Sequence, residues 1–277
     1  EDEMRNHEYS KKQMIVIAML SIAMLALAVL LNHFFPVNSR EASTEPRPTI
    51  SPAPTATPVP APTPVPDPTE TVAAFLQGPK SWKRGLEWSG EWGDEYYDGG
   101  KFGGFGCGLC CMANIYTTFS GGKCSPVDMY GYAKKVSGYS GGGAIDWGYM
   151  KETLKRTGFS SDVWRKPDSY RKFQKQVQNV MACIVVVSSY DSDCYWKNTA
   201  GHYVTIFHYD AKTDRIFLTD SGNPSHNRQW VALKKIYKSL KTSNRWQYLA
   251  VTSFDAAGDQ WKHKSFGGNC ILPKRWQ

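Results

Sequence analysis

The chain has 277 residues and carries 33 Lys and Arg against 25 Asp and Glu, a formal net charge of +8. A basic balance of this kind suits anionic partners, but no nucleic-acid-binding motif accompanies it, so we expect no nucleic acid among the partners. The sequence also contains no internal repeat.

The first predicted element is an apolar segment at residues 14–31, MIVIAMLSIAMLALAVLL, whose only polar member is Ser21. It is long enough to span a bilayer. No clear small-residue cleavage site follows it, which favours an uncleaved anchor over a secretory signal. Lys and Arg precede the segment, so the positive-inside rule places the N-terminus in the cytoplasm. We predict a cytoplasmic tail over 1–13 and a single-pass transmembrane signal anchor over 14–35, with the C-terminal domain outside the cell membrane.

A proline-rich stretch follows the anchor, and residues 45–70 hold ten of the sixteen prolines. Alternating prolines favour the polyproline II conformation, which extends the chain by about 3.1 Å per residue, so the stretch would reach on the order of 75 Å. A ligand for SH3-type domains is the alternative interpretation, but such partners are mostly intracellular. We predict a linker over 36–70.

The remaining residues, 71–277, are numerous enough for one domain with a hydrophobic core. They hold 28 Lys and Arg against 17 Asp and Glu, a net charge of about +11. Outside a membrane, this charge suits lipid headgroups, anionic cell-wall polymers or acidic peptides. A basic surface without a specific partner is the alternative.

All seven cysteines lie in this domain, at positions 107, 110, 111, 124, 183, 194 and 270. Outside the cytosol, an odd number leaves at least one thiol unpaired or bonded to another chain. Disulfides are the structural alternative to reactive thiols: Cys110 or Cys111 with Cys124, and Cys183 with Cys194 unless these two are simply buried.

Helices are predicted early in the domain and strands late. Capping signals and apolar spacing predict helices at 107–119, 125–136, 144–158 and 169–180. β-Branched and alternating runs then predict a buried strand at 182–190, a two-stranded hairpin over 202–220, another helix at 230–240 and a last strand at 246–254. This order predicts an α+β fold.

A cluster of cysteines begins the first of these helices, in GGFGCGLCCMANIY. At the helix start, unpaired backbone N–H groups and the positive end of the helix dipole stabilise a thiolate, which favours Cys107 as a nucleophile. A nucleophilic thiolate also needs an imidazole and a third group that orients the ring. His202 begins the first strand of the hairpin and Asp220 ends the second.

The register of this hairpin decides which residue orients His202. If the turn covers 210–214, Asp220 faces Val204 on the same face as His202, and diagonal neighbours of this kind are about 7 to 8 Å apart at Cα. A slip of one residue turns Asp220 away and brings Asn223 opposite His202. We favour Asp220 as the orienting residue and keep Asn223 as the alternative.

The order of several motifs resembles a known family. GCG at a helix start is followed by SPVDMYGYAKK, GGGAIDWGYMKETLKRTGF, GHYVTIFHYD and FLTDSG. This pattern resembles the papain-like cysteine peptidases of the bacteriocin-leader (double-glycine) type, family C-thirty-nine, and especially their stand-alone relatives. The resemblance covers most of residues 77–220. It implies a bacterial thiol protease of papain-like fold, with N-terminal helices packed on a C-terminal antiparallel sheet.

The resemblance also implies four site residues. Cys107 of GCG would be the nucleophile, His202 of the G-H motif the base, and Asp220 the residue that orients His202. Gln77, in AFLQGPKSW, matches an upstream glutamine whose side-chain N–H helps to bind the oxyanion. No cofactor and no metal is implied.

Parts of the chain depart from the family pattern. Leu109 and the two cysteines after it stand where proline and small residues are usual, and Ser221 follows Asp220 where proline is usual. The segment between Gln77 and Cys107 is also long, as if it contained an insertion.

Cys110 is the alternative nucleophile, because CGLCC also resembles the C-G-[SA]-C-[WY] motif of papain and the cathepsins. That alignment requires a glutamine six residues earlier, where this chain has Gly104. The mismatch favours Cys107.

Other polar and aromatic residues are expected to be structural. His208 shares the strand face of His202 and is expected in the fold or in a cleft wall, while His226 and His263 are expected at the surface. The aromatic residues near the insertion either line a cleft or pack inside, and packing is favoured; they are Trp82, Trp88, Trp92, Tyr96 and Tyr97.

Two other kinds of chemistry fit the sequence less well. A redox pair formed by Cys107 and Cys110 lacks the expected βαβ setting, and a structural zinc site lacks a second pair of ligands. We therefore predict a membrane-anchored extracytoplasmic cysteine peptidase with peptide or protein substrates. The alternatives are a cell-wall peptide amidase or endopeptidase with the same triad and an inactive surface-binding module of the same fold.

Overall fold

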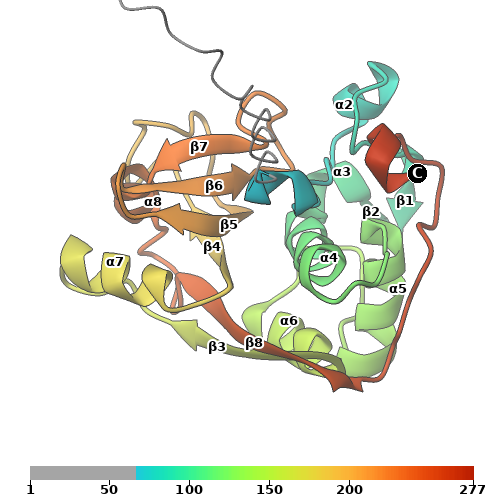
Figure 1. The fold of residues 1–277 in the computed structure, drawn as a ribbon. Helices are drawn as coiled ribbons and strands as arrows, with labels where there is room; N and C mark the ends of the chain where they lie inside the picture. The colour runs from blue at the N-terminus through green and yellow to red at the C-terminus, as the bar shows by residue number, and fades with distance from the viewer. Residues whose placement is uncertain (1–66) are drawn as a thin grey trace, which may run out of the picture. The chain divides into compact units, whose positions relative to one another are not determined.

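A six-stranded antiparallel sheet separates two groups of helices in residues 67–277, the part of the chain that the computed structural model describes (Figure 1). The order of the strands across the sheet is β3-β8-β4-β5-β6-β7. Two short strands, β1 and β2, pair with each other outside this sheet. The predicted α+β class, with helices on an antiparallel sheet, is confirmed.

The elements have the following bounds. The helices are α2 (Pro79–Lys83), α3 (Phe102–Phe105), α4 (Cys107–Phe119), α5 (Pro126–Ser137), α6 (Trp147–Arg156), α7 (Tyr170–Gln178) and α8 (Leu233–Ser239), with short 3₁₀ helices η1 (Pro68–Thr71), η2 (Glu91–Gly93) and η3 (Lys274–Trp276). The strands are β1 (Tyr96–Tyr97), β2 (Gly100–Lys101), β3 (Thr157–Trp164), β4 (Ala182–Val187), β5 (His202–Asp210), β6 (Arg215–Thr219), β7 (Gln229–Ala232) and β8 (Tyr248–Asp259).

Both faces of the sheet are covered, which explains the unbroken apolar run of β4. Ile184 and Val186 pack in the core shared with α4, α5 and α6, while Cys183 and Val185 pack in a second core with α7 and α8. Successive side chains of a strand point to opposite faces, so every residue of a doubly covered strand is buried. All six residues of β4 are buried accordingly.

Helix α4 lies at the centre of the helical group, and eleven of its thirteen residues are buried. A helix that is apolar on all sides belongs in the core. Its one amide side chain, Asn114, is 1 % exposed and has two partners. Its Oδ1 accepts from the N–H of Phe75 at 2.8 Å, and its Nδ2 donates to Thr219 Oγ1 of β6 at 3.2 Å.

The chain enters the domain as an extended, buried segment, residues 72–77, which lies between α4 and the end of β6. Buried peptide groups need hydrogen-bond partners, and side chains from distant elements supply several of them. Thr118 Oγ1 accepts from the N–H of Ala73, and Asn227 Nδ2 donates to the carbonyl of Ala74 at 2.7 Å. Trp92 Nε1 donates to the carbonyl of Leu76 at 2.9 Å. This network fixes the position of Gln77 at the end of the segment.

Residues before this segment also belong to the folded part, although the sequence assigned them to the linker. Thr69 in η1 is 6 % exposed. The guanidinium of Arg228 donates to the carbonyls of Thr69 and Val72. The folded part therefore includes Asp67 and η1.

The hairpin of β5 and β6 has a β-bulge at His208. Next to the turn, Asp210 pairs with Arg215, one residue out of the predicted register. Beyond the bulge Thr205 pairs with Thr219, which is the register that we predicted for the end near His202. His208 has a positive φ of 34°, and the extra residue that it inserts compensates for the tighter turn.

Two predicted elements need correction. The helix predicted at 230–240 begins with strand β7, because Val231 pairs with Ile216 and extends the sheet. The helix predicted at 144–158 ends at Arg156 and leads directly into β3, which the sequence did not predict. In both cases backbone pairing with a distant strand overrides the local helical pattern.

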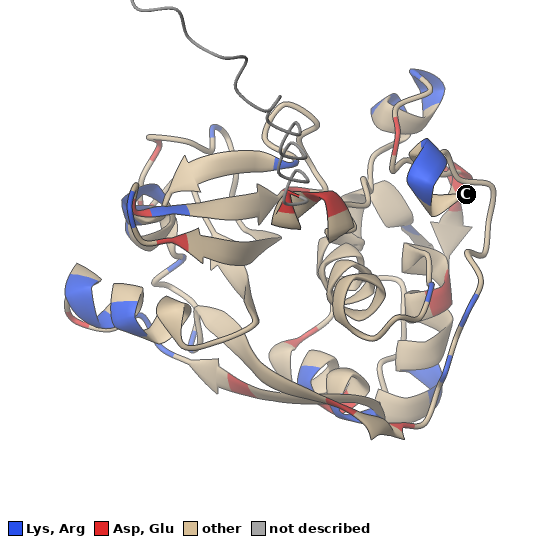
Figure 2. Ribbon diagram, viewed as in Figure 1, with Lys and Arg blue, Asp and Glu red and all other residues tan. Residues whose placement is uncertain are grey.

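The outer helices α7 and α8 carry a concentration of Lys and Arg (Figure 2). These are Arg171, Lys172, Lys175, Lys234, Lys235 and Lys238. Within residues 67–277, Lys172 is the only one of the six in an ion pair, with Asp168 at 2.9 Å. Part of the positive charge that the composition gives this domain therefore lies on this side of the sheet. We call the six residues of α7 and α8 the basic face.

The predicted tail (1–13), anchor (14–35) and all but the last residues of the linker (36–70) lie outside the described residues. Of the helices formed within 67–277, none has both the length and the apolar character that a membrane span requires.

Replacement of Asn114 by Ala is expected to reduce the free energy of unfolding by about 2 to 3 kcal/mol, because it leaves the buried N–H of Phe75 without a partner. Urea unfolding followed by tryptophan fluorescence measures this change. Asn179→Ala is the matched control, since its exposed amide bonds only the carbonyl of Lys175, and it should cost less than about 0.5 kcal/mol. Equal losses in the two variants would show that Asn114 does not connect the segment to α4.

Candidate active site

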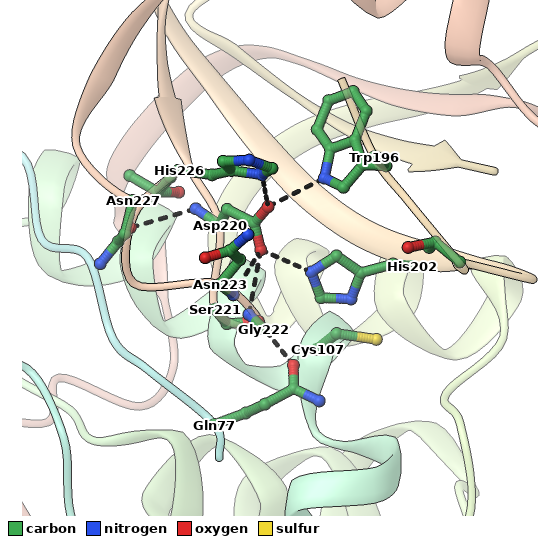
Figure 3. A network of polar contacts seen from close by, with 12 residues as sticks. Gln77, Cys107, Trp196, His202, Asp220, Ser221, Gly222, Asn223, His226 and Asn227 are labelled. Atoms are coloured by element: carbon green, nitrogen blue, oxygen red, sulfur yellow. Dashed lines mark hydrogen bonds and ion pairs between the residues drawn. The ribbon is translucent and has the colours of Figure 1, made fainter. Parts of the chain in front are cut away.

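His202 and Asp220 meet at the end of the sheet, as the sequence predicted (Figure 3). Nε2 of His202 lies 2.8 Å from Oδ1 of Asp220, and this contact leaves the other ring nitrogen, Nδ1, for a second partner. Burial by itself favours the neutral imidazole, but the charge of Asp220 and the hydrogen bonds to Asp220 and Cys107 raise the pKa of His202 to about 10.

The carboxylate of Asp220 is fully buried and is surrounded by donors. Oδ1 also accepts from the backbone N–H groups of Gly222 at 3.0 Å and Asn223 at 3.1 Å, and Oδ2 accepts from Trp196 Nε1 at 2.9 Å. Burial alone would raise the pKa of Asp220, but the charge of His202 and these donors hold it well below its usual range. The carboxylate therefore stays ionised beside the imidazole.

Asn223, the alternative orienting residue, contacts Asp220 only through its backbone. Its side-chain Oδ1 accepts from the N–H and the hydroxyl of Ser225. The hairpin register at this end directs the side chain of Asp220, and not that of Asn223, to the ring of His202.

Cys107 is the first residue of α4 and lies beside His202 (Figure 3). Its side chain is buried, and burial alone raises the pKa of a thiol. The hydrogen bond and charge of His202, with the backbone N–H groups of Tyr203 and Gly108, nevertheless hold the pKa of Cys107 below the ordinary value of 9.0. The geometry favours a thiolate next to an imidazolium.

Cys110 and Cys111 have the opposite environment. Burial among apolar groups, together with the neighbouring thiols, raises the pKa of Cys110 well above 9.0, and burial does the same to Cys111. A neutral buried thiol is inert. The structure thus distinguishes Cys107 from its sequence rival Cys110.

The seven cysteines are all free thiols. The disulfides considered from the sequence are therefore absent. Cys124 and Cys183 are buried as free thiols, and Cys194 is an exposed free thiol. Among residues 67–277, no group of three or more His, Cys, Asp and Glu side chains is placed to hold a metal ion.

Gln77 lies next to Cys107 at the end of the buried entry segment (Figure 3). Its Nε2 donates to the carbonyl of Gly103 at 2.9 Å, and its Oε1 accepts from the hydroxyl of Ser221 at 2.6 Å. One N–H of the carboxamide remains after these bonds. Gln77 is 6 % exposed, so its side chain is held by packing as well.

His226 and Trp196 belong to this site, although the sequence assigned His226 to the surface and did not single out Trp196. Nδ1 of His226 lies 3.4 Å from Oδ2 of Asp220, and its ring stacks on Tyr195. Neither residue lies in a recognisable motif. Only the chain folding back over Asp220 brings them there.

The other predicted structural residues lie away from this centre. His208 lines a separate cavity of about 360 Å³, and burial lowers its pKa. His263 Nδ1 donates to the carbonyl of Lys123 at 2.7 Å. Trp88 and Trp92 are buried around Phe75, so packing is confirmed for these two aromatics, whereas Tyr96 is exposed.

A pocket of about 490 Å³ lies beside the pair of His202 and Asp220. Residues 195–201 form one wall, and Gly222, Asn223 and His226 contribute to the other. The pocket borders the ring of His202, so a group bound in it would lie within reach of that imidazole.

Residues 144–247 match the family described as phytochelatin synthase, which belongs to the papain-like cysteine peptidase clan. The match includes His202 and Asp220. Among solved structures, one named "Crystal structure of an putative C39-like peptidase from Bacillus anthracis" aligns with 12% identity and a TM-score of 0.39, covering 67% of this chain and 97% of that chain. No curated protein matches with significance. The match to the phytochelatin synthase model supports the resemblance to papain-like cysteine peptidases that the sequence predicts.

Alkylation of Cys107 by iodoacetamide is expected to proceed already near pH 6, because its pKa is lowered and the imidazole of His202 remains protonated up to about pH 10. His202→Ala removes this support. Labelling should then slow about tenfold or more at pH 6 and much less at pH 9, where an unassisted thiol ionises by itself.

Peptide mapping by mass spectrometry identifies the labelled residue, and Cys110→Ala serves as the control that leaves the labelling intact. Early label on Cys110 would instead support the papain-type alignment of CGLCC.

Proposed function

We propose that the chain is a cysteine peptidase that hydrolyses peptide bonds through an acyl-enzyme. The observation that carries the proposal is the position of His202, whose Nε2 is held by the buried carboxylate of Asp220 while its ring lies beside Cys107 at the start of α4 (Figure 3). An activated nucleophile, a base and a group that orients the base are the requirements for covalent acyl transfer.

In the proposed acylation, the thiolate of Cys107 attacks the carbonyl carbon of the substrate and forms the carbon–sulfur bond. The carbonyl oxygen becomes an oxyanion, which the backbone N–H of Cys107 and the side-chain N–H of Gln77 stabilise. The imidazolium of His202 then gives its proton to the leaving amine as the peptide bond breaks. The pocket beside His202 and Asp220 would receive this leaving part of the substrate.

In deacylation, water replaces the amine. His202 takes a proton from the water as it attacks the thioester, a second oxyanion forms in the same place, and Cys107 leaves as the thiolate. Asp220 stays ionised throughout and keeps Nε2 protonated, so that Nδ1 carries every proton transfer.

A second candidate is acyl transfer to an amine. The matched family is named for a synthesis, and the same thioester can react with an amine in place of water. The pocket at His202 would then admit the acceptor after the first amine has left.

Hydrolysis of unfolded casein by the full chain tests the proposal. Cys107→Ser should reduce the rate of hydrolysis by at least about 10³-fold. Cys110→Ser should leave the rate within about twofold of the unmodified chain, since Cys110 has no role in the proposed mechanism. Cleavage of murein peptides but not casein would favour the wall amidase, and incorporation of added glycinamide would favour acyl transfer to an amine.

A chain that releases no product from any of these substrates, with Cys107 still reactive toward iodoacetamide, would contradict the hydrolytic proposal and favour the inactive binding module.

We further propose that residues 14–35 anchor the enzyme in the cell membrane, with the domain outside. The apolar run and the preceding positive charges support this proposal. Deletion of 14–35 should release the protein from carbonate-washed membranes into the soluble fraction, because no other predicted span would remain. A deletion of the same length in the linker, 45–66, is the control and should leave it in the membrane; release of both or neither would contradict the anchor.

A further inference from the structure

Two consecutive residues directly after β6 contact the two halves of the site. Asp220 contacts His202, and Ser221 contacts Gln77. Ser221 is 3 % exposed, and its hydroxyl lies 2.6 Å from Oε1 of Gln77. A second bond joins the same pair, since the backbone N–H of Gln77 donates to the carbonyl of Ser221 at 2.9 Å.

The contact determines which end of the carboxamide faces Cys107. Oε1 can only accept, so a hydroxyl that donates to it holds the oxygen on the side of Ser221. Nε2 is then directed to Gly103 and the neighbourhood of Cys107. Without the hydroxyl, Oε1 would be a buried acceptor with no partner, and such an acceptor is stable only if the amide turns or moves toward water.

We propose that Ser221 is a positioning residue, which holds the carboxamide of Gln77 with its free N–H aimed at the oxyanion. The inference rests on the proposed function, in which Gln77 stabilises that oxyanion. Ser221 does not contact the reacting atoms in this mechanism and acts only through Gln77.

The position of Ser221 in the chain gives the contact a further consequence. Asp220 and Ser221 are the two residues that directly follow β6, so one short segment orients both the base, through Asp220, and the oxyanion donor, through Ser221. Proline, which the family pattern has at this position, carries no hydroxyl and could not make the contact with Gln77. Ser221, which stands where proline is usual in the family pattern, would thus have a role in this chain that proline could not fill.

Two reagents separate the effect on the oxyanion from an effect on the thiol. Acylation of Cys107 by p-nitrophenyl acetate passes through a tetrahedral oxyanion, whereas alkylation by iodoacetamide is a displacement at saturated carbon that forms none. The burst of p-nitrophenolate from the full chain measures the first rate, and mass spectrometry of Cys107 measures the second.

Gln77→Ala should slow the ester burst by about 10²-fold, the scale of losing one oxyanion donor. Ser221→Ala should slow it by about tenfold or more, because a misplaced donor retains part of its effect. Alkylation at pH 6 should change less than twofold in both variants. Ser221→Thr keeps the hydroxyl and should keep the burst rate near that of the unmodified chain.

The double variant Gln77→Ala with Ser221→Ala decides the mechanism. If Ser221 acts only through Gln77, the double variant should acylate at the rate of Gln77→Ala alone. An independent, multiplicative loss would overturn the proposal, and so would a normal burst in Ser221→Ala or an equal slowing of burst and alkylation, which indicates general distortion of the site.

Failure of the proposed function gives a different result. If p-nitrophenyl acetate gives no burst with the unmodified chain, the premise that Gln77 serves an oxyanion is lost, whether or not iodoacetamide still labels Cys107. A reactive Cys107 whose ester burst responds to Gln77→Ala but not to Ser221→Ala overturns the role of Ser221 alone.

Discussion

The arrangement of the site depends on one buried charge. The carboxylate of Asp220 is removed from water, and an unpaired buried charge would cost several kcal/mol. It is therefore surrounded by the ring of His202, the indole of Trp196 and two backbone N–H groups, with the ring of His226 close by. These partners come from β5, from the loop before it and from the chain after β6, so satisfying one carboxylate brings these segments together and fixes the ring that faces Cys107.

The second half of the site depends on a backbone segment with no regular structure of its own. Residues 72–77 are buried, and their peptide groups bond side chains of α4, of η2 and of the chain after β6. Such a segment is held by tertiary contacts alone. It delivers Gln77 to the start of α4, and the contact with Ser221 connects it to the same strand end that carries Asp220. Gln77 and His202 are thereby linked through the residues that directly follow β6.

The predicted partners and the predicted location depend on other parts of the chain. The Lys and Arg of α7 and α8, of which Lys172 alone forms an ion pair within residues 67–277, lie on the outer side of the sheet (Figure 2). Binding of anionic cell-wall polymers to such a face stays a prediction, as does the transmembrane segment at 14–35.

The sequence by itself determined the α+β class, the position of Cys107 at a helix start and the pairing of His202 with Asp220, because helix ends and hairpins are local features with clear residue patterns. The pairing also needed the right register, and the bulge at His208 restored it after a turn that was one residue shorter than predicted. Only the tertiary structure decided that β7 precedes α8, that all seven thiols are free, and that His226, Trp196 and Ser221 reach the site. These outcomes depend on contacts between residues far apart in the chain, where strand pairing and burial, and not local propensity, select the conformation.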